Sequence, residues 1–307
     1  MKKLLLGLSI LALMLMAACG GEESEATEGE TIEVEHSLDT VEVEKNPEKV
    51  VVFDFGILDT LKQLDVDVTG VPKDSLPSYL SEYEGDDYEH VGGLKEPDFE
   101  AIHAMDPDLI IISGRQMDLY EDFKEIAPTI FIEIDAENYM DSFKQNTELM
   151  GQIFDKQNQV EEELSEIEGL VEELQAKTES SDQTGLITLA TGGKVSAYGP
   201  GSRFGIIHDV FGVKPADDSI EVATHGQNIS FEFIVEKDPD YLYVIDRDAV
   251  VNNEEAAKET IENDLVKKTT AYQNDQIVYL DPNYWYLSGG GLISVKEMVN
   301  EINQTFE

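Results

Sequence analysis

A segment of 19 residues occurs twice in this chain of 307 residues and divides it into two related halves. The first copy, PDFEAIHAMDPDLIIISGR, covers residues 97–115, and the second, ISFEFIVEKDPDYLYVIDR, covers residues 229–247. Seven of the 19 positions are identical, and the last of them is an arginine. A duplicated unit of this kind predicts two similar lobes rather than one continuous core.

Each copy reads as a short helix followed by a buried strand. Phe-Glu-x-Ile opens the helix, and Asp-Pro-Asp ends it because proline disfavours the helical conformation in the residue before it. The apolar runs at 109–113 and 241–245 suit strands of a parallel sheet that is covered on both faces. Strand and helix signals also open the two halves, near 50–64 and 186–211. We therefore expect an α/β fold with two Rossmann-like lobes and mostly parallel sheets.

A long helix is expected between the two copies. Residues 155–177 contain no proline, and their apolar residues recur at helical spacing. This pattern predicts a long linking α-helix at 156–180, between an N-terminal lobe at 45–155 and a C-terminal lobe at 181–307. A surface helix that belongs to one lobe is the alternative.

The first 19 residues carry the signs of export and lipid attachment. Lys2 and Lys3 precede the apolar run Leu4–Met16, and small residues then lead to Cys19, which is the only cysteine. A basic start, a short apolar run and small residues before a cleavage point form a secretory signal. The apolar run is shorter than the ~20 residues that span a bilayer. We expect residues 1–19 to be a lipoprotein signal peptide with Cys19 lipidated; an ordinary cleavage site beside an unrelated cysteine is the alternative.

Residues 20–44 are rich in carboxylates and poor in large apolar side chains, so we expect an extended acidic tether. The weak alternation at 31–43 is also compatible with a strand on the folded body. The formal net charge of the chain is −44, which argues against binding to nucleic acid and against adsorption on anionic lipid. Contact with the membrane is therefore expected through the lipid anchor only.

The three arginines of the chain follow three predicted strands. They are Arg115, Arg203 and Arg247, among 21 basic residues in total. Arg115 and Arg247 end the two repeat copies, so they should face each other across a cleft between the lobes, at the carboxyl ends of the strands. The guanidinium fork binds carboxylate or catecholate oxygens in pairs and stays charged. The trio therefore predicts an anionic ligand, whereas structural ion pairs, for Arg247 with Asp246 or Asp248, are the alternative.

The sequence contains none of the catalytic signatures that we sought. There is no H-E-x-x-H, no G-x-S-x-G and no phosphate loop, and the residues after Cys19 hold no thiol. We expect a binding protein and not an enzyme. A surface adhesin or another interaction lipoprotein is the alternative from a different class.

These features together resemble the class III (helical-hinge) substrate-binding proteins of bacterial iron importers. The resemblance covers the chain from about residue 45 to its end and is strongest to the petrobactin-binding type, which binds catecholate siderophores. It implies a monomer on the extracellular face of the cell membrane that captures an anionic ferric catecholate in the interlobe cleft. The partners implied are an ABC permease and its ATPase, and no intrinsic cofactor is implied, because Fe(III) is bound through the siderophore. The same fold binding ferric citrate, haem or another iron chelate remains open.

The resemblance also assigns residues. It implies that Arg115, Arg203 and Arg247 hold the ferric catecholate centre and that Lys95, in VGGLKEPDFE, lines the pocket. His225, in ATHGQN, and Tyr286, in PNYWYLSGGG, match positions that complete iron coordination when the chelator leaves iron sites open. A loop histidine without a metal contact is the alternative for His225.

Two further pairs of residues are candidates. Trp285, the only tryptophan, can form an aromatic wall with Tyr284 and Tyr286 for flat catechol rings, although packing in the core is the alternative. Glu100 and Glu232 are repeat-equivalent, and the resemblance implies that they dock on arginines of the permease. Their alternative role is to favour the start of a helix through its dipole.

Overall fold

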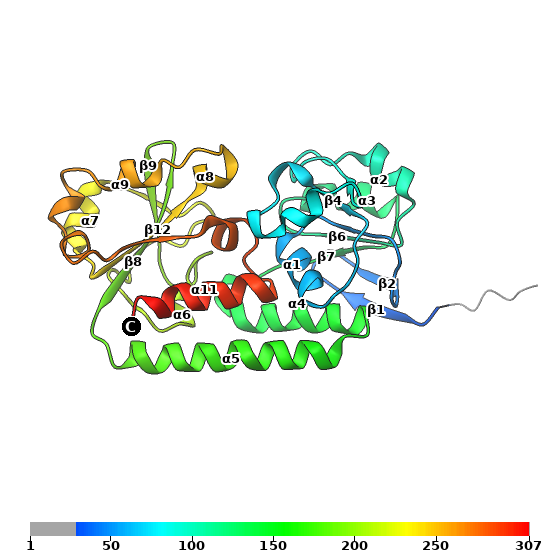
Figure 1. Cartoon of the computed structure of the whole chain (residues 1–307), viewed down its shortest axis with the longest axis horizontal. Coiled ribbons are helices and arrows are strands. Elements are labelled where there is room, and N and C mark those ends of the chain that lie inside the picture. The colour runs from blue at the N-terminus through cyan, green and yellow to red at the C-terminus, as the bar shows by residue number, and fades with distance from the viewer. Residues whose placement is uncertain (1–28, 307) are drawn as a thin grey trace, which may run out of the picture.

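Two α/β lobes stand side by side over a long helix in the computed structural model, which describes residues 29–306 (Figure 1). The predicted signal peptide 1–19, Cys19 included, and residues 20–28 lie outside the described residues. Within the described part of the chain, no helix is long and apolar enough to cross a membrane.

The strands in the described residues are β1 (Thr31–Glu35), β2 (Thr40–Glu44), β3 (Val50–Val52), β4 (Gly70–Val71), β5 (Glu89–His90), β6 (Leu109–Ile112), β7 (Thr129–Phe131), β8 (Thr184–Thr191), β9 (Lys194–Tyr198), β10 (Lys214–Pro215), β11 (Gln227–Ile229), β12 (Tyr241–Asp246) and β13 (Ile277–Leu280). The α-helices are α1 (Phe55–Gln63), α2 (Phe99–Met105), α3 (Tyr120–Lys124), α4 (Tyr139–Ile153), α5 (Gln157–Glu179), α6 (Ile206–Asp209), α7 (Phe231–Lys237), α8 (Arg247–Val251), α9 (Ala257–Ile261), α10 (Thr270–Gln273) and α11 (Leu292–Gln304). Short helical turns include η2 (Ser78–Glu84), η3 (Met117–Leu119) and η6 (Asn283–Leu287).

The N-terminal lobe is built on a five-stranded sheet with the order β5-β4-β3-β6-β7, and every pair in it is parallel. The residues of β3 and β6 are all buried, which explains why both strands are wholly apolar. The strand order reverses between β3 and β6. A crevice suited to a ligand is therefore expected outside their carboxyl ends, where the chain continues to Arg115.

The C-terminal lobe has a six-stranded sheet with the order β11-β9-β8-β12-β13, and β10 also pairs with β8. Strands β8, β12 and β13 are parallel, whereas β9 and β11 run antiparallel to their neighbours. The β8–β9 hairpin turns at Gly192 (φ 55°) and Gly193 (φ 72°), a left-handed conformation that glycine adopts without strain. The predicted α/β fold with mostly parallel sheets is confirmed.

The two repeat copies fold alike. Helices α2 and α7 both end at the aspartate of Asp-Pro-Asp, and both aspartates are left-handed, with φ 52° at Asp106 and φ 42° at Asp238. Aspartate is one of the few side chains that tolerate this conformation. The backbone N–H of each aspartate donates to a carbonyl in the preceding turn, and the buried strands β6 and β12 follow.

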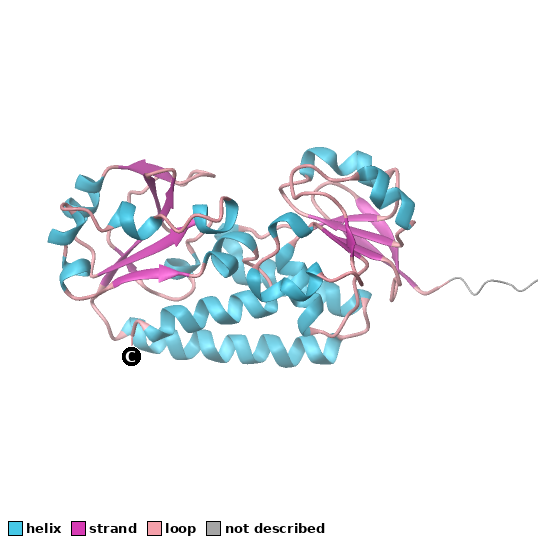
Figure 2. Cartoon of the chain, turned by 45° about the horizontal axis from the view of Figure 1, so that its top comes forward, coloured by secondary structure: helices cyan, strands magenta, loops and turns pink. Residues whose placement is uncertain are grey.

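Helix α5 runs beneath both lobes, as Figures 1 and 2 show. Its 23 residues give a length of about 35 Å. Its buried face, which includes Val160, Ile167 and Leu174, packs against α4 and α11. The linking helix predicted at 156–180 thus corresponds to α5, and α4 and α11 widen it into a helical layer.

Two boundaries differ from the sequence-based expectation. Residues 31–44 are not an extended tether but an antiparallel hairpin, β1–β2, because Val34 and Val43 on one face of it are buried in the core. The second difference concerns α11, which we expected within the C-terminal lobe at 181–307. It packs against α5 and against α1 of the first lobe, so it belongs to the layer that joins the lobes, and only its far end contacts Tyr241 of the C-terminal lobe.

Candidate functional site

The three arginines come from three connections that follow strands, one in the N-terminal lobe and two in the C-terminal lobe. Arg115 follows β6, Arg203 lies in the loop after β9, and Arg247 is the first residue of α8, directly after β12. Between them runs the turn η6, which connects β13 to α11 and carries Tyr286.

All three guanidinium groups bind Tyr286. The Nη2 atoms of Arg115 and Arg203 donate to the backbone oxygen of Tyr286 at 3.3 and 2.6 Å, and Arg247 Nε donates to its phenol oxygen at 2.8 Å. The guanidinium carbon of Arg203 also lies 4.5 Å from the centre of the Tyr286 ring, and that of Arg247 lies 5.7 Å from it. The structure therefore brings the predicted trio together around one residue.

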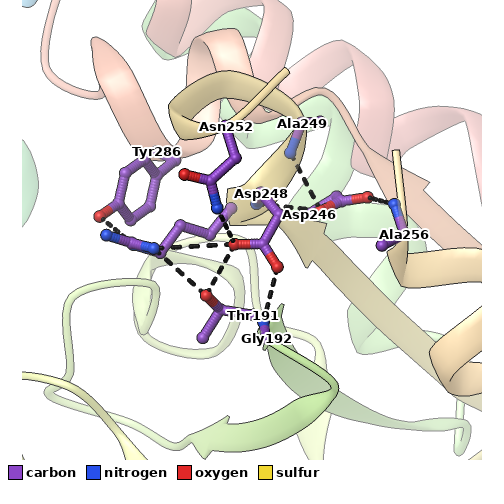
Figure 3. A network of polar contacts seen from close by, with 9 residues as sticks. Thr191, Gly192, Asp246, Asp248, Ala249, Asn252, Ala256 and Tyr286 are labelled. Atoms are coloured by element: carbon purple, nitrogen blue, oxygen red, sulfur yellow. Dashed lines mark hydrogen bonds and ion pairs between the residues drawn. The ribbon is translucent and has the colours of Figure 1, made fainter. Parts of the chain in front are cut away.

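The side chains of Thr191 and Asp248 contact the guanidinium group of Arg247. Its Nη1 donates to Thr191 Oγ1 at 3.2 Å and lies 3.7 Å from Asp248 Oδ1 (Figure 3). The Asp248 carboxylate is mainly occupied elsewhere: it accepts from Gly192 N at 2.6 Å and from Thr191 Oγ1 at 2.9 Å. Asp246 accepts from backbone N–H groups of α8 and of residues 256 and 257, and so does not pair with Arg247. The aspartates beside Arg247 thus fix the backbone more than they neutralise its charge.

The charge of the trio is largely uncompensated. In the described part of the chain, no carboxylate lies within 4.0 Å of the side-chain nitrogens of Lys95, Arg115 or Arg203. Arg203 keeps exposed surface, although desolvation and the nearby charge of Arg115 lower the pKa of its guanidinium; it remains charged. Desolvation raises the pKa of the Tyr286 phenol, but the hydrogen bond from Arg247 and the three arginine charges outweigh it, so this pKa is lowered.

A cavity of about 310 Å³ opens between the lobes beside this cluster. One wall comes from the N-terminal lobe, with Lys95 and Arg115, and the other comes from Arg247 and Tyr286. The apolar lining consists of Leu94, Val250, Val251 and Leu287, and the remaining lining residues are Asp74, Ser75, Gly93 and Glu96. The cavity thus offers cations and apolar surface together.

A larger hollow, of about 740 Å³, lies elsewhere, beside α9 and β13. Its lining includes Asp246, Glu255, Glu259, Glu262 and Asp281, and a single lysine. Because this field repels anions, we place the candidate site at the smaller interlobe cavity.

Three predicted pocket residues do not line the cavity. Arg203 is one of them, although it binds the backbone oxygen of Tyr286, which does. Trp285 is 2% exposed and its Nε1 donates to Glu301 Oε2 at 2.5 Å, so it packs in the core and the prediction of an aromatic wall is wrong for it. His225 is exposed and does not line the cavity, because its loop lies outside it, next to Tyr198 at the end of β9. Among the described residues, no group of three or more His, Cys, Asp or Glu side chains is arranged to hold a metal ion.

Glu100 and Glu232 lie in the first turns of α2 and α7, one on each lobe, and both are exposed. Hydrogen bonds from its own backbone N–H and from the Ser230 side chain lower the pKa of Glu232. Both glutamates are therefore available to a partner, and both also fit the alternative role at a helix start.

Several residues of the site were not predicted. Thr191, which binds Arg247, has a recognisable signal, since it ends a strand just before the Gly192-Gly193 turn. The apolar lining by Val250 and Val251 has none, because two valines after an arginine also suit a core helix.

Comparisons with known proteins identify relatives in sequence and in fold. Residues 50–284 match the periplasmic binding protein family. The chain is 46% identical over 316 aligned residues to the petrobactin-binding protein YclQ of Bacillus subtilis (strain 168), with 100% of both chains covered. The crystal structure of YclQ superposes with a TM-score of 0.89 at 49% identity, covering 91% of this chain and 99% of that one. The catecholate-siderophore-binding protein VctP from Vibrio cholerae gives a TM-score of 0.85 at 34% identity, covering 90% and 100%.

Proposed function

The chain belongs to the periplasmic binding protein family, and we propose that it captures an anionic ferric catecholate siderophore of the petrobactin type for an ABC importer. The identity to the petrobactin-binding relative over the full length of both chains supports this ligand class. We further propose that the chain acts as a monomeric binding protein rather than as an enzyme.

The observation that carries the proposal is the convergence of Arg115, Arg203 and Arg247 on Tyr286 at the edge of the interlobe cavity. A chain with a net charge of −44 gathers its three arginines at one place. Three guanidinium groups can neutralise a ferric tris-catecholate, which carries about three negative charges, and can bind its oxygens in pairs. Lys95 adds a fourth cation on the wall that also carries Arg115.

The apolar lining favours a catecholate over a purely polar chelate. Leu94, Val250, Val251 and Leu287 border the same cavity as the cations. Catechol rings can bury their faces and edges against such side chains, at about 25 cal/mol for each Å² of apolar area removed from water. Ferric citrate has no comparable apolar surface, so it would leave this part of the cavity without a partner.

Tyr286 is the candidate for direct iron coordination when a chelator leaves iron positions open. Its phenol already lies among the arginines, and its lowered pKa favours the phenolate form that binds iron. His225 can take part only if its loop moves toward the cavity, because its side chain is exposed outside it.

The proposal also includes delivery of the bound ligand to the ABC permease. Glu100 and Glu232, exposed on separate lobes, would pair with basic residues of the permease, and the ATPase would drive transport. We propose that lipidated Cys19 and the residues that follow it hold the protein at the extracellular face of the bacterial membrane, where two acyl chains give a stable anchor.

Titration of the full chain with ferric petrobactin, ferric enterobactin, ferric citrate, haem and cobalamin tests the ligand class. Trp285 is adjacent in sequence to Tyr286 and reports binding through its fluorescence. We expect the ferric catecholates to bind with dissociation constants below about 1 μM and ferric citrate to bind more weakly. Failure of every ferric catecholate to bind below that concentration would disprove the assignment.

A further inference from the structure

A buried carboxyl group joins the two lobes behind the candidate site. Asp59 lies on α1 of the N-terminal lobe and is 0% exposed. Its Oδ1 accepts from the backbone N–H of Ile293 at 3.2 Å, and its Oδ2 accepts from that of Ser294 at 3.0 Å. These N–H groups open α11, the helix that follows the Tyr286 turn. Asp59 therefore caps a helix that starts 233 residues further along the chain.

The contact is too close for any residue but glycine at position 291. A Cβ atom built on Gly291 would lie 2.0 Å from Asp59 Oδ1. The last glycine of the Ser-Gly-Gly-Gly run thus allows the carboxyl group to reach the helix start.

A chain of hydroxyl groups links Asp59 to both ends of the turn that carries Tyr286. Tyr79 of η2 has its hydroxyl oxygen 2.9 Å from Asp59 Oδ2 and 2.7 Å from Ser288 Oγ. Ser288 Oγ donates to the backbone oxygen of Asn283 at 2.6 Å. The backbone N–H of Ser78 also donates to the Asn283 side chain at 3.0 Å, so the N-terminal lobe holds the turn at its first residue and just after its last.

We propose that Asp59 is a positioning residue for the ligand site: through Tyr79 and Ser288 it fixes the turn that presents Tyr286 to the three arginines. The inference rests on the proposed function for its effect on binding. It concerns residues outside the binding site itself, since none of Asp59, Tyr79 and Ser288 lines the ligand cavity.

Counting hydrogens shows how the proton on Asp59 controls the turn. Ser288 uses its own hydrogen toward Asn283, so its oxygen needs a donor, and Tyr79 has only one hydrogen to give. When Asp59 is protonated, it donates to Tyr79, Tyr79 donates to Ser288, and every member of the chain has a partner. When Asp59 is ionised, it takes the hydrogen of Tyr79, and Ser288 loses its donor. We therefore expect the protonated form to hold the turn more firmly.

The surroundings of Asp59 shift the loss of its proton into the physiological pH range. Burial raises the pKa of Asp59 to about 7, although its hydrogen bonds oppose the shift. The titratable groups that face it are the phenols of Tyr79, Tyr83, Tyr139 and Tyr284, from η2, α4 and η6. No lysine, arginine or histidine in the described residues forms an ion pair with it. Its protonation state is thus set by burial and hydrogen bonds.

The test compares the full-length protein with its D59N variant at pH 5.5 and pH 8.5. The asparagine amide can donate to Tyr79 as the protonated acid does, but its nitrogen cannot also accept from the backbone N–H of Ser294, so the readout is the change of relative affinity with pH. With ferric petrobactin as the probe, the ratio of the wild-type to the variant dissociation constant should rise by about threefold or more between pH 5.5 and pH 8.5, because a preorganised turn binds more tightly. Taking the ratio cancels protonation of the siderophore itself. A ratio that does not change with pH, or that falls as pH rises, overturns the proposal.

A second readout needs no ligand and therefore separates this proposal from the proposed function. Trp285 lies within the turn, and its fluorescence should change across pH 7 in the wild type and not in D59N. Tyr79→Phe keeps the carboxyl group but removes the relay, so it should also abolish this transition. Asp65→Asn, an exposed aspartate just beyond α1, is the matched control and should behave as the wild type. A transition that persists in D59N excludes Asp59 as its source.

Discussion

Arg115 and Arg247 occupy the same position in the two repeat copies, and they bind opposite ends of the same tyrosine. Arg115 donates to the backbone oxygen of Tyr286 at 3.3 Å, and Arg247 donates to its phenol oxygen at 2.8 Å. The duplication thus produces one cation on each wall of the cleft. Tyr286 comes from neither copy but from the turn before the last helix, which is fixed to the N-terminal lobe. The site is therefore assembled from three separate parts of the chain.

The first prediction concerns the two arginines that share the Tyr286 carbonyl. Arg115→Ala and Arg203→Ala should each weaken binding of a ferric catecholate by more than about tenfold, or about 1.4 kcal/mol, since each removes an unpaired cation from the cavity edge. Fluorescence titration measures the effect. Lys49→Ala is the control, because it removes the same charge at the amino end of β3, away from the cleft. Unchanged affinity in both arginine variants would point to a neutral ligand.

The second prediction separates the charge of Arg247 from its geometry. Arg247→Lys keeps the charge but loses the donors to the Tyr286 phenol and to Thr191. We expect an affinity about three- to tenfold lower, because the ammonium cannot bind two oxygens in a fixed plane. Thr191→Val, which removes the acceptor for the guanidinium and the hydrogen bond to Asp248 but leaves Arg247 itself in place, should have a smaller effect. Equal affinity of Arg247→Lys and the wild type would show that charge alone matters at this position.

The third prediction concerns the phenol of Tyr286. Tyr286→Phe keeps the carbonyl that binds Arg115 and Arg203. Affinity for a chelator that fills all six iron positions should change less than about threefold. A chelator that leaves positions open should bind much more weakly and lose its phenolate-to-iron absorption band. If both chelators lose affinity equally, Tyr286 acts through Arg247 and not on the metal.

The sequence predicted the arginine cluster because its signal is local. Arg115 and Arg247 closely follow the parallel strands β6 and β12, whose carboxyl ends form the ligand-binding edge of their sheets. Arg203 lies five residues after β9, which is antiparallel to β8, so this rule does not place it. The same reasoning failed for Trp285, which is next to Tyr286 in sequence but turns into the core, where Glu301 of α11 accepts its N–H. Nothing in the sequence shows to which side of the short turn η6 each ring points.

The burial and the contacts of Asp59 could not be predicted from the sequence for a different reason. In FGILDTLKQ it reads as a polar position on the exposed face of an amphipathic helix. It is buried because α11 covers that face, and the two backbone N–H groups that its carboxyl group caps are more than 230 residues away in the chain. The β1–β2 hairpin was predicted only as an alternative, a strand at 31–43, because few apolar residues mark it and its acidic face dominates its composition.

The fourth prediction tests whether that hairpin is part of the folded body. Val43→Ala should lower the free energy of unfolding by about 2 kcal/mol, since Val43 is fully buried in the core. Val41→Ala, on the same strand but only partly buried, should cost less. Urea denaturation measures both changes. Equal small effects would mean that residues 31–44 do not contribute to the core in solution.

The fifth prediction follows from two aspartates whose pKa values are shifted in opposite directions. Burial raises the pKa of Asp59 to about 7, above its value of about 3.9 in the unfolded chain. The contribution of protonated Asp59 to the free energy of unfolding is therefore fully present below about pH 4 and is lost as pH rises toward 7. Hydrogen bonds from Ser219 and Lys237 lower the pKa of Asp217 to about 2, so its contribution is present above pH 4 and is lost as pH falls toward 2.

Relative to the wild type, the melting temperatures of Asp59→Asn and Asp217→Asn should therefore change in opposite directions as pH rises. Relative to the wild type, Asp59→Asn should gain stability between pH 4 and pH 8, because the variant never has to bury a charge. Asp217→Asn should lose stability relative to the wild type between pH 2 and pH 5, because the ionised wild-type carboxylate binds Lys237 and the amide cannot. Parallel curves for Asp59→Asn and the wild type would mean that Asp59 titrates near its ordinary value, and the control of the Tyr286 turn by its proton would then lie outside the physiological range.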